Sequence, residues 1–454
     1  MNKLTSEVGT EYRQKQSILW GRMVLNIKPK SPLAGWGNYP ISSADLFRPE
    51  RSHQLSQTQG CIIPRGLGRS YGDAALNADH QVLLMERLRC MLDFDEKTGI
   101  LRADAGVTFE EILDVFVPRG WFFPVTPGTK YVTLGGCVAC DVHGKNHHWS
   151  GTLGAHIKEL EVVLADGSRR RCTPKTDENL FWATIGGMGL TGIISEVTVQ
   201  LIPIETAYMI VQHHSTNDLD TTLDTLGNSE KDDKYSVAWI DCLTSGGRMG
   251  RSIVMNGHHA QPGEISSKSK DLSHISKKGG RSIPFDLPSW VLNSLTVKAF
   301  NAFYYKWQSR KNYPFIVDYD HYFYPLDSIS HWNRLYGKRG FVQYQFVVPG
   351  ENSREALKVI LGKFVQSKRA SFLAVLKRFG QEGKGMLSFP REGYTLALDL
   401  PVSDGLFPLL DEIDELVLKY GGRVYLAKDA RMKPETFRAM YPRYPEWRRV
   451  KAAV

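Results

Sequence analysis

The chain has 454 residues, of which 42% are hydrophobic and 11% aromatic, a composition typical of a globular protein with two or three domains. Residues Met1 to Gln16 are polar and charged, and no run reaches the roughly 18 apolar residues of a membrane span. We therefore expect neither a secretory signal peptide nor a transmembrane helix. The expected location is the cytoplasm or the inner face of the membrane.

The net charge is +9, with 57 Lys and Arg against 48 Asp and Glu. This balance fits an anionic substrate, an anionic membrane surface or nucleic acid, and does not choose among them. Cysteine is sparse, so we expect buried thiols and no disulfide framework. The six cysteines occupy positions 61, 90, 137, 140, 172 and 242.

A glycine-rich segment, Pro64–Asp73, follows the apolar residues Cys61–Ile63, which we expect to form a strand. Without side chains at Gly66, Gly68 and Gly72, backbone N–H groups can surround an anionic pyrophosphate. The spacing differs from the dinucleotide fingerprint and no clear helix follows, so this segment alone is weak evidence.

The next elements predict an α+β unit. Ile100–Val107 is expected to form a strand, and Phe109–Val117 an amphipathic helix with Thr108 as its N-cap. A second glycine-rich stretch follows, in Pro127–Thr129 and Thr133–Gly144. The two glycine-rich stretches together look like the two phosphate loops of a flavin enzyme.

Further along, Glu159–Leu164 and Ser168–Cys172 are expected to pair as a hairpin through the turn Asp166-Gly167. A glycine-rich turn within 186–192 then precedes a strand, Ile193–Leu201.

After about residue 205, aromatic-rich strands at Phe341–Val348 and Tyr394–Leu400 alternate with helices near 352–368 and 404–420. This pattern predicts an antiparallel sheet backed by helices. Residues 257–281 are polar and basic and are expected to form a mobile loop.

Taken together, these segments resemble the FAD-binding domain of the vanillyl-alcohol oxidase type and, within that type, the decaprenylphosphoryl-β-D-ribose 2′-oxidase family. The resemblance runs from about Gly35 to Trp447. The motifs that carry it are Arg65–Asp73, Ala139–His148, Gly187–Ile194, Tyr324–Asp327, Gln343–Phe346, Leu376–Gly380 and Tyr425–Asp429.

The resemblance implies an α+β flavoprotein with an FAD-binding domain at 1–204, ordered from about residue 30. A substrate or cap domain at 205–410 and a C-terminal segment at 411–454 that returns to the FAD domain complete the expected organisation. The residues expected to bind FAD are Arg65, Gly66, Leu67, Gly68, Arg69, Ser70, Tyr71, Gly72, Asp73, Gly128, Thr129, Thr133, Leu134, Gly135, Gly136, Cys140, Asp141, Val142, His143, Gly192, Ile194 and Tyr425.

Arg69 stands where many sugar and aldonolactone oxidases of this superfamily carry a histidine bonded to the flavin. A guanidinium is not a nucleophile at neutral pH. We therefore expect FAD to be held without a covalent bond; a surface salt bridge is the alternative role for Arg69.

The spacing Cys137-x-x-Cys140-x-x-His143 raises the alternative of a zinc site. A structural zinc needs four ligands, and no second Cys-x-x-Cys completes the set, so we expect no metal. We expect the two cysteines to pack against the flavin and His143 to lie near its reactive face. A core histidine is the alternative.

Oxidation of a sugar hydroxyl through a flavin requires alignment of the C–H bond, removal of a proton and stabilisation of negative charge on the flavin. Lys428 is the leading candidate for one of the last two roles, because it follows the apolar residues Val424–Ala427, expected to be a strand, and burial would lower its pKa. A surface lysine is the alternative. His143 and Tyr71 complete the candidate catalytic set.

Gln343 and Gln345 are expected to lie on one face of their strand, because side chains alternate along a strand. The spacing alone suits an ordinary sheet surface equally well. The resemblance implies that both bind the substrate, together with Lys377, Tyr324 and Lys428.

Three functions compete. The resemblance implies oxidation of a polyprenyl-phosphoryl ribose at C2′ to the 2′-keto sugar, the first half of an epimerisation that supplies the arabinose donor of actinobacterial cell walls. An NADH-dependent short-chain reductase partner and peripheral membrane association go with this function, whereas nucleic acid does not. The alternatives are an aldonolactone or alditol oxidase and a non-catalytic FAD-bound electron-transfer module.

The sequence departs from the family in two places. Residue 397 is alanine where mycobacterial members carry a cysteine. The chain ends at Val454, where relatives usually continue through a short tail, which bears on how the active site closes.

Overall fold

The computed structural model describes residues 28–454, apart from residues 59, 370 and 372 and segments 229–232, 266–271, 276–279 and 289–290. Over this part of the chain, strands form three larger sheets and two short pairs. The short pairs join β7 (Trp121–Phe122) to β11 (Ile202–Pro203) and β15 (Arg281–Ser282) to β17 (Ile329–Ser330).

The first two sheets come from the N-terminal part of the chain. One has the strand order β1-β2-β4-β3, and the other the order β5-β6-β10-β8-β9. Their strands are β1 (Lys28–Ala34), β2 (Ile41–Phe47), β3 (Ile62–Arg65), β4 (Gln81–Leu84), β5 (Met91–Asp95), β6 (Ile100–Asp104), β8 (Ile157–Val163), β9 (Arg169–Cys172) and β10 (Ile193–Gln200).

The third sheet has eight strands in the described part of the chain, in the order β16-β12-β14-β13-β19-β20-β18-β21. All its pairings are antiparallel. Its strands are β12 (Tyr208–Thr216), β13 (Tyr235–Ile240), β14 (Ser252–His259), β16 (Phe315–Asp318), β18 (Phe341–Pro349), β19 (Ala374–Phe379), β20 (Gly393–Pro401) and β21 (Arg423–Val424).

Helices cover one face of this large sheet. Leu396, Leu398 and alternate residues of β18 pack there against α6, α9 and α10 in one apolar core. A second core joins β6, β8 and β10 to α2 and α3. The helices are α2 (Phe109–Phe116), α3 (Leu134–Ala139), α4 (His147–Ser150), α5 (Glu178–Thr184), α6 (Leu219–Gly227), α7 (Ser294–Gln308), α8 (Tyr319–Phe323), α9 (Gly350–Ser367), α10 (Leu406–Lys419), α11 (Pro434–Met440) and α12 (Tyr444–Ala452).

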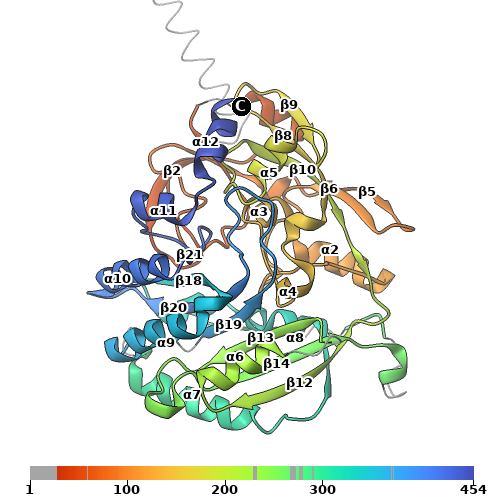
Figure 1. The fold of residues 1–454 in the computed structure, drawn as a ribbon. Helices are drawn as coiled ribbons and strands as arrows, with labels where there is room; N and C mark the ends of the chain where they lie inside the picture. Colours follow the sequence, from red (N-terminus) through yellow and green to blue (C-terminus); the bar gives the residue numbers. More distant parts are fainter. Residues whose placement is uncertain are drawn as a thin grey trace, which may run out of the picture.

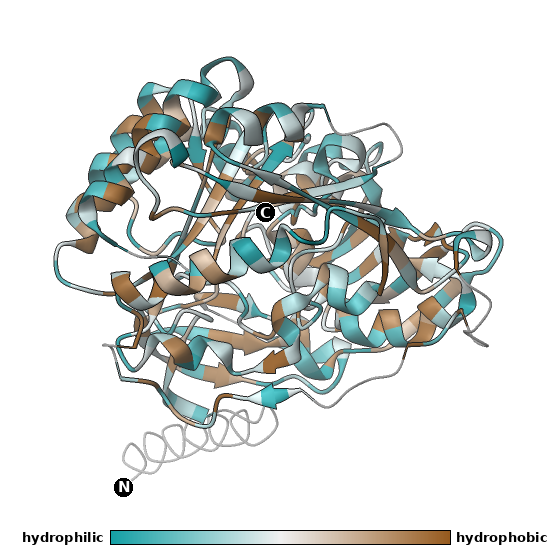
Figure 2. Cartoon of the chain, turned by 90° about the horizontal axis from the view of Figure 1, so that it is seen from below, coloured by the Kyte–Doolittle hydropathy of each residue, from teal (hydrophilic) through white to brown (hydrophobic). Residues whose placement is uncertain are grey.

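The views in Figures 1 and 2 show how these layers are arranged. Strands β8 and β10 lie at the top of Figure 1, β18, β19 and β20 cross the middle, and β12 and β14 lie at the bottom. Seen from below, hydrophobic segments run along the strands, while the outer helices mix hydrophobic and hydrophilic residues (Figure 2). This mixture is typical of helices with one face on a core.

The structure confirms the expected mixed architecture and most of its elements. Helix α2 begins after Thr108, whose side chain accepts from the Glu111 N–H while the Glu111 carboxylate accepts from the Thr108 N–H. Strands β8 and β9 form the expected hairpin, with Gly167 at a φ of 81° that favours glycine in the turn.

Three sequence predictions need correction. Residues 257–259 belong to β14 and pair with β12, so the loop expected at 257–281 begins later and lies partly outside the described residues. Of the strand expected at Val424–Ala427, only Val424 is in β21, and Lys428 lies in the turn that follows. The second glycine-rich stretch is not entirely a loop. Thr133 is the N-cap of α3, since its side chain accepts from the Gly136 N–H, and Gly135 and Gly136 therefore lie in a helical turn.

Candidate active site

A large cavity lies between the two glycine-rich stretches and the face of the eight-stranded sheet opposite α6, α9 and α10. Its volume is about 1230 Å³. Single small-molecule pockets are typically about 300–1,000 Å³. The cavity therefore has room for a large cofactor together with part of a substrate.

The two glycine-rich stretches meet at one wall of the cavity. A Cβ at Gly66 would lie 2.1 Å from Thr133 Oγ1, so only glycine permits this approach. Gly68 has a φ of 63°, and a Cβ at Gly128 would have no heavy atom within 4 Å. This part of the wall therefore presents bare backbone.

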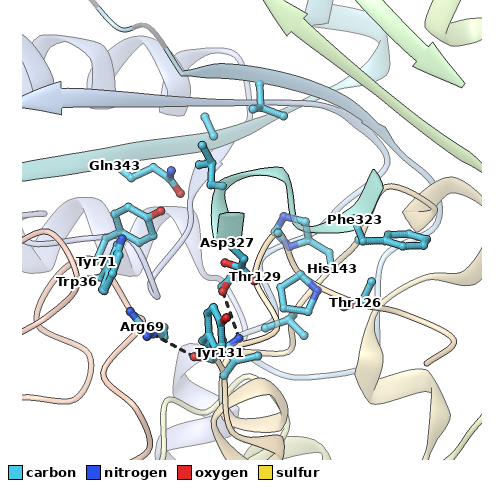
Figure 3. A pocket seen from close by; sticks show the side chains of 18 of the residues that line it. Trp36, Arg69, Tyr71, Thr126, Thr129, Tyr131, His143, Phe323, Asp327 and Gln343 are labelled. Atoms are coloured by element: carbon cyan, nitrogen blue, oxygen red, sulfur yellow. Dashed lines mark hydrogen bonds between the residues drawn. The ribbon is translucent and has the colours of Figure 1, made fainter. Parts of the chain in front are cut away.

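Arg69 lies beside this wall. Its Nε donates to the Tyr131 carbonyl at 3.0 Å, and its guanidinium is 4.1 Å from the centroid of the Trp36 ring. Figure 3 shows Arg69, Trp36 and Tyr71 together on one side of the cavity and His143 on the opposite side. Trp36 is a cavity residue that the sequence motifs did not single out for a role.

Lys428 enters the cavity from the turn after β21. Its N–H donates to the Tyr425 carbonyl at 2.9 Å, and its ammonium is 3.7 Å from the centroid of the Tyr71 ring. Burial lowers the pKa of Lys428 to about 7, although the Asp399 carboxylate acts in the opposite direction. Lys428 therefore exchanges a proton near neutral pH.

Asp399 is fully buried and was not predicted as a site residue. It accepts a hydrogen bond from Gln343 Nε2 at 2.5 Å, and the Tyr336 hydroxyl donates to it at 3.4 Å. Burial raises the pKa of Asp399 to about 7. The alternation of side chains along β20 could have identified it, because Asp399 shares a face with Ala397.

A hydrogen-bond relay fixes the protonation of His143. The Thr395 hydroxyl donates to the Phe346 carbonyl at 2.8 Å, so its oxygen accepts from Gln345 Nε2 at 3.2 Å. The same amide nitrogen lies 3.0 Å from His143 Nε2 and donates to it. The proton of neutral His143 is therefore on Nδ1, which is buried and has no hydrogen-bond partner among the described residues.

Burial also lowers the pKa of His143 well below its ordinary value, and the nearby Lys377 ammonium adds to the effect. The imidazole is consequently neutral at physiological pH. With Nε2 already accepting, it can offer a hydrogen bond from Nδ1 but has no lone pair free for a proton.

Two further lysines line the cavity. Burial lowers the pKa of Lys377 to about 8 and that of Lys145 to about 7. Lys145 donates to the Tyr322 carbonyl, and its ammonium is 4.0 Å from the centroid of the Tyr322 ring. Lys145 was not predicted as a site residue. The cavity therefore holds several buried lysines, and their protonated forms suit a phosphoryl ligand.

The cavity brings most of the predicted site residues together. Those that line it are Gly66, Leu67, Gly68, Arg69, Ser70, Tyr71, Gly128, Thr129, Thr133, Gly135, Gly136, Cys140, Val142, His143, Ile194, Gln343, Gln345, Lys377, Tyr425 and Lys428. The predicted residues outside this lining are Arg65, Gly72, Asp73, Leu134, Asp141, Gly192 and Tyr324.

Several of the residues outside the lining hold its walls in place. Arg65 donates to the Ala34 carbonyl at 2.6 Å, and the Tyr324 hydroxyl is 2.5 Å from Thr126 Oγ1. Asp141 accepts from the Gly154 N–H at 2.9 Å.

Cys137 is buried, and Cys140 lines the cavity with its sulfur 3.9 Å from Ser70 Oγ. Both are free thiols. Across the described ranges, no three His, Cys, Asp or Glu side chains are grouped as metal ligands.

Comparison with known proteins identifies the family. A family model described as an FAD binding domain matches residues 52–173. The chain is 40% identical over 433 residues to decaprenylphosphoryl-β-D-ribose oxidase of Mycolicibacterium smegmatis, which covers 93% of this chain and 94% of the relative. The chain belongs to the decaprenylphosphoryl-ribose oxidase family. It is an FAD-dependent oxidoreductase with a vanillyl-alcohol oxidase type FAD domain.

Two other relatives are more distant. An uncharacterized protein of Streptomyces coelicolor is 33% identical over 365 residues, covering 77% of this chain and 96% of the relative. An alditol oxidase of a Streptomyces species is 26% identical over 186 residues, which is 39% of this chain and 42% of the relative. The likeness to the alditol oxidase therefore leaves most of the chain unmatched.

The site fits the cofactor of this family. The open space beside the Gly128 backbone, in the cavity wall that Gly66 and Thr133 hold close together, is a cradle that a side chain would fill. The unpartnered Nδ1 of His143 adds a buried donor in the same cavity. Both features suit an anionic, hydrogen-bonding ligand such as FAD.

Proposed function

We propose that the protein oxidises a polyprenyl-phosphoryl β-D-ribose at C2′ to the 2′-keto sugar. The observation that carries the proposal is a single cavity lined both by the two glycine-rich stretches and by Lys428 and Lys377. The Mycolicibacterium relative, a decaprenylphosphoryl-β-D-ribose oxidase, is named for the same sugar and for oxidation. When bound, FAD would supply the acceptor, at its N5, for the hydride that leaves C2′.

In this function Lys428 accepts the proton of the 2′-hydroxyl. A pKa of about 7 leaves a substantial fraction of the amine neutral at physiological pH. His143 is the other candidate, but its Nε2 accepts from Gln345 and only an N–H remains. We therefore assign His143 to hydrogen-bond donation that orients the reacting sugar.

Tyr71 contributes its ring and its hydroxyl. Burial raises the pKa of Tyr71 well above its ordinary value, so the phenol stays protonated. Its ring lies against the Lys428 ammonium and restricts where that group can point. We assign it to positioning of the proton acceptor.

The remaining cavity residues would bind the glycosyl phosphate. Lys377 and Lys145 would bind the phosphoryl group in their protonated forms, which the adjacent phosphoryl charge favours because it raises the pKa of both amines. Gln343 and Gln345 make hydrogen bonds to Asp399 and His143, so in this proposal they act mainly by fixing those partners. Tyr324, whose hydroxyl is hydrogen-bonded to Thr126 Oγ1, would support the cavity wall behind the substrate.

The test is anaerobic mixing of the holoenzyme with a short-chain polyprenyl-phosphoryl ribose, followed by the absorbance of FAD. Bleaching by this compound, with little bleaching by free alditols or aldonolactones, supports the proposal. The reverse order of substrates would assign the protein to sugar-alcohol or lactone oxidation.

The assignment of Lys428 predicts a pH dependence. Only the neutral amine accepts a proton, so the rate of flavin reduction is expected to fall about tenfold per pH unit below the Lys428 pKa of about 7, and to level off above it. Asp399→Asn removes the charge that raises this pKa and should shift the profile to lower pH. Stopped-flow reduction across the pH range checks both. A rate that falls as pH rises past 7 would instead make the ammonium the active form.

We also propose that FAD is bound without a covalent link. Arg69 occupies the loop position of the usual flavin-linked histidine, and its side chain contacts Trp36 and Tyr131. Acid precipitation of the holoenzyme is expected to release the yellow colour into the supernatant. Colour that stays in the pellet contradicts this prediction.

Ala397 leads to a prediction about inhibitors. It lines the cavity and pairs with Gln345 across the sheet, where mycobacterial members carry cysteine. Nitroaromatic compounds that trap the family's cysteine are expected to leave no lasting adduct here. Intact-mass analysis after turnover checks this, and an Ala397→Cys variant that does form the adduct serves as the positive control.

Two further parts of the proposal concern domain limits and a partner protein. We propose domain limits of 1–204, 205–410 and 411–454, with the last segment returning to the FAD domain; Trp447 Nε1 donating to the Ala183 carbonyl at 3.0 Å supports that return. We also propose an NADH-dependent short-chain reductase as the partner that completes epimerisation. No helix in the described ranges has the length and apolar character to cross a bilayer.

A further inference from the structure

Helix α7 (Ser294–Gln308) buries polar residues beside Val297 and exposes several large apolar ones. Asn301 and Gln308 are buried, whereas Leu295 is 76% and Phe303 is 68% exposed. Phe300 and Trp307 are also exposed. A surface helix normally buries its apolar residues, so the outward apolar residues of α7 call for a partner.

The inner face explains how this orientation is maintained. Asn301 Nδ2 donates to Asp241 Oδ1 at 2.9 Å, and Asp241 is also held by Arg251. The Tyr305 hydroxyl donates to the Thr216 carbonyl at 3.1 Å. These polar contacts attach α7 to the sheet and leave Leu295, Phe303 and Trp307 exposed.

The outer side also carries positive charge. Residues 294–311 contain no Asp or Glu and four basic residues. These are Lys298, Lys306, Arg310 and Lys311. Aromatic and aliphatic side chains interspersed with lysine and arginine are typical of helices that lie in the interface of an anionic membrane.

Helix α7 also borders the cavity. Tyr304, Trp307 and Gln308 belong to the cavity lining, and Trp307 is 48% exposed as well. The neighbouring lining along the sheet is mostly apolar, with His213 and Lys311 among the apolar residues Val211, Val237, Trp239, Met255 and Phe315. An apolar arm of the cavity therefore reaches the outer surface beside α7.

We propose that the outer face of α7, formed by Leu295, Lys298, Phe303, Lys306 and Trp307, docks on an anionic lipid surface, so that the isoprenoid chain of the substrate enters the apolar arm beneath it. The route of the isoprenoid chain rests on the function proposed above. The docking itself follows from the exposed apolar residues and their basic neighbours.

The first test measures binding of the FAD-loaded protein to vesicles of phosphatidylcholine with phosphatidylglycerol. The unmodified protein is expected to bind them and to bind pure phosphatidylcholine vesicles at least about tenfold more weakly. Leu295→Ser combined with Phe303→Ser, and separately Lys298→Glu combined with Lys306→Glu, should each weaken binding at least about tenfold.

Matched controls keep the test specific. Trp149 is 60% exposed and lies on α4, so Trp149→Ser removes a comparable aromatic residue from another surface. Lys97→Glu combined with Lys175→Glu changes the net charge equally on other exposed segments. Both controls should bind vesicles as the unmodified protein does.

A second measurement separates this inference from the proposed function. Flavin reduction by a water-soluble, short-chain polyprenyl-phosphoryl ribose should be unchanged in the α7 variants, because neither pair lines the cavity. Failure of the unmodified protein to bind anionic vesicles, or equal binding by the α7 variants, overturns docking whatever that reaction shows. A concentration-dependent dimer that the same variants abolish, without an effect on vesicle binding, would assign this face to a second copy of the chain.

Discussion

Replacing Lys428 by methionine is expected to slow flavin reduction roughly a hundredfold while FAD binding persists. Methionine keeps most of the apolar stem but removes the amine that lies over the Tyr71 ring and next to Asp399. Loss of a proton acceptor worth on the order of 3 kcal/mol in the transition state gives a change of this size. Rapid mixing with a polyprenyl-phosphoryl ribose analogue under anaerobic conditions measures it.

Lys433→Met is the matched control, because Lys433 is 60% exposed and pairs with Asp411 outside the cavity. Its reduction rate should equal that of the unmodified protein. A Lys428→Met rate within about threefold of the unmodified protein removes Lys428 from the mechanism. The next variant to examine would then be His143→Gln.

Much of the site could be predicted from local sequence patterns. Alternation along residues 341–348 placed Gln343 and Gln345 on one face, and the structure turns that face toward the cavity. Tyr344 points the other way and donates to Asp414 at 2.7 Å. Glycine positions were equally informative, because the contact of Gly66 with Thr133 leaves no space for a side chain.

The missed residues depend on long-range pairing. Asp399 meets Gln343 only because β20 pairs with β18, and Thr395 orients Gln345 through the same register. A strand pattern gives the face of a residue but not its neighbour across the sheet. The protonation of His143 could not be predicted for the same reason, since it follows from a chain of contacts between distant segments.

Helix α7 illustrates a different limit. Its sequence places Lys298 and Lys306 among aromatic residues, and Asn301 offers no sign of burial until Asp241 is placed beside it. Burial of a polar residue is acceptable once it is hydrogen-bonded, so pattern alone identifies neither face with certainty. The direction of α7 depends on a partner sixty positions away in the chain.

Gly72→Ala is expected to have the second large effect. Gly72 lies where the first glycine-rich stretch packs, backbone against backbone, on the segment that carries Lys428. The Tyr71 N–H donates to the Ala427 carbonyl at 3.2 Å, and the Asp73 N–H donates to the Asp429 carbonyl at 3.3 Å. A Cβ at Gly72 would lie 1.6 Å from that same Asp429 oxygen. Backbone on both sides must move apart to accept it.

The expected cost is about 1–3 kcal/mol of stability, the usual range for forced overpacking. FAD affinity should fall at least about tenfold, since about 1.4 kcal/mol of lost binding free energy corresponds to that factor. Thermal unfolding and titration of the apoprotein with FAD measure the two effects.

Gly247→Ala is the control, because a Cβ there has no heavy atom within 4 Å. If Gly72→Ala matches this control in both measurements, the 71–73 and 427–429 segments are not coupled as the structure indicates. Loss of FAD affinity together with slow reduction in any FAD-saturated Gly72→Ala protein would show that this one backbone contact positions both the cofactor wall and the Lys428 amine.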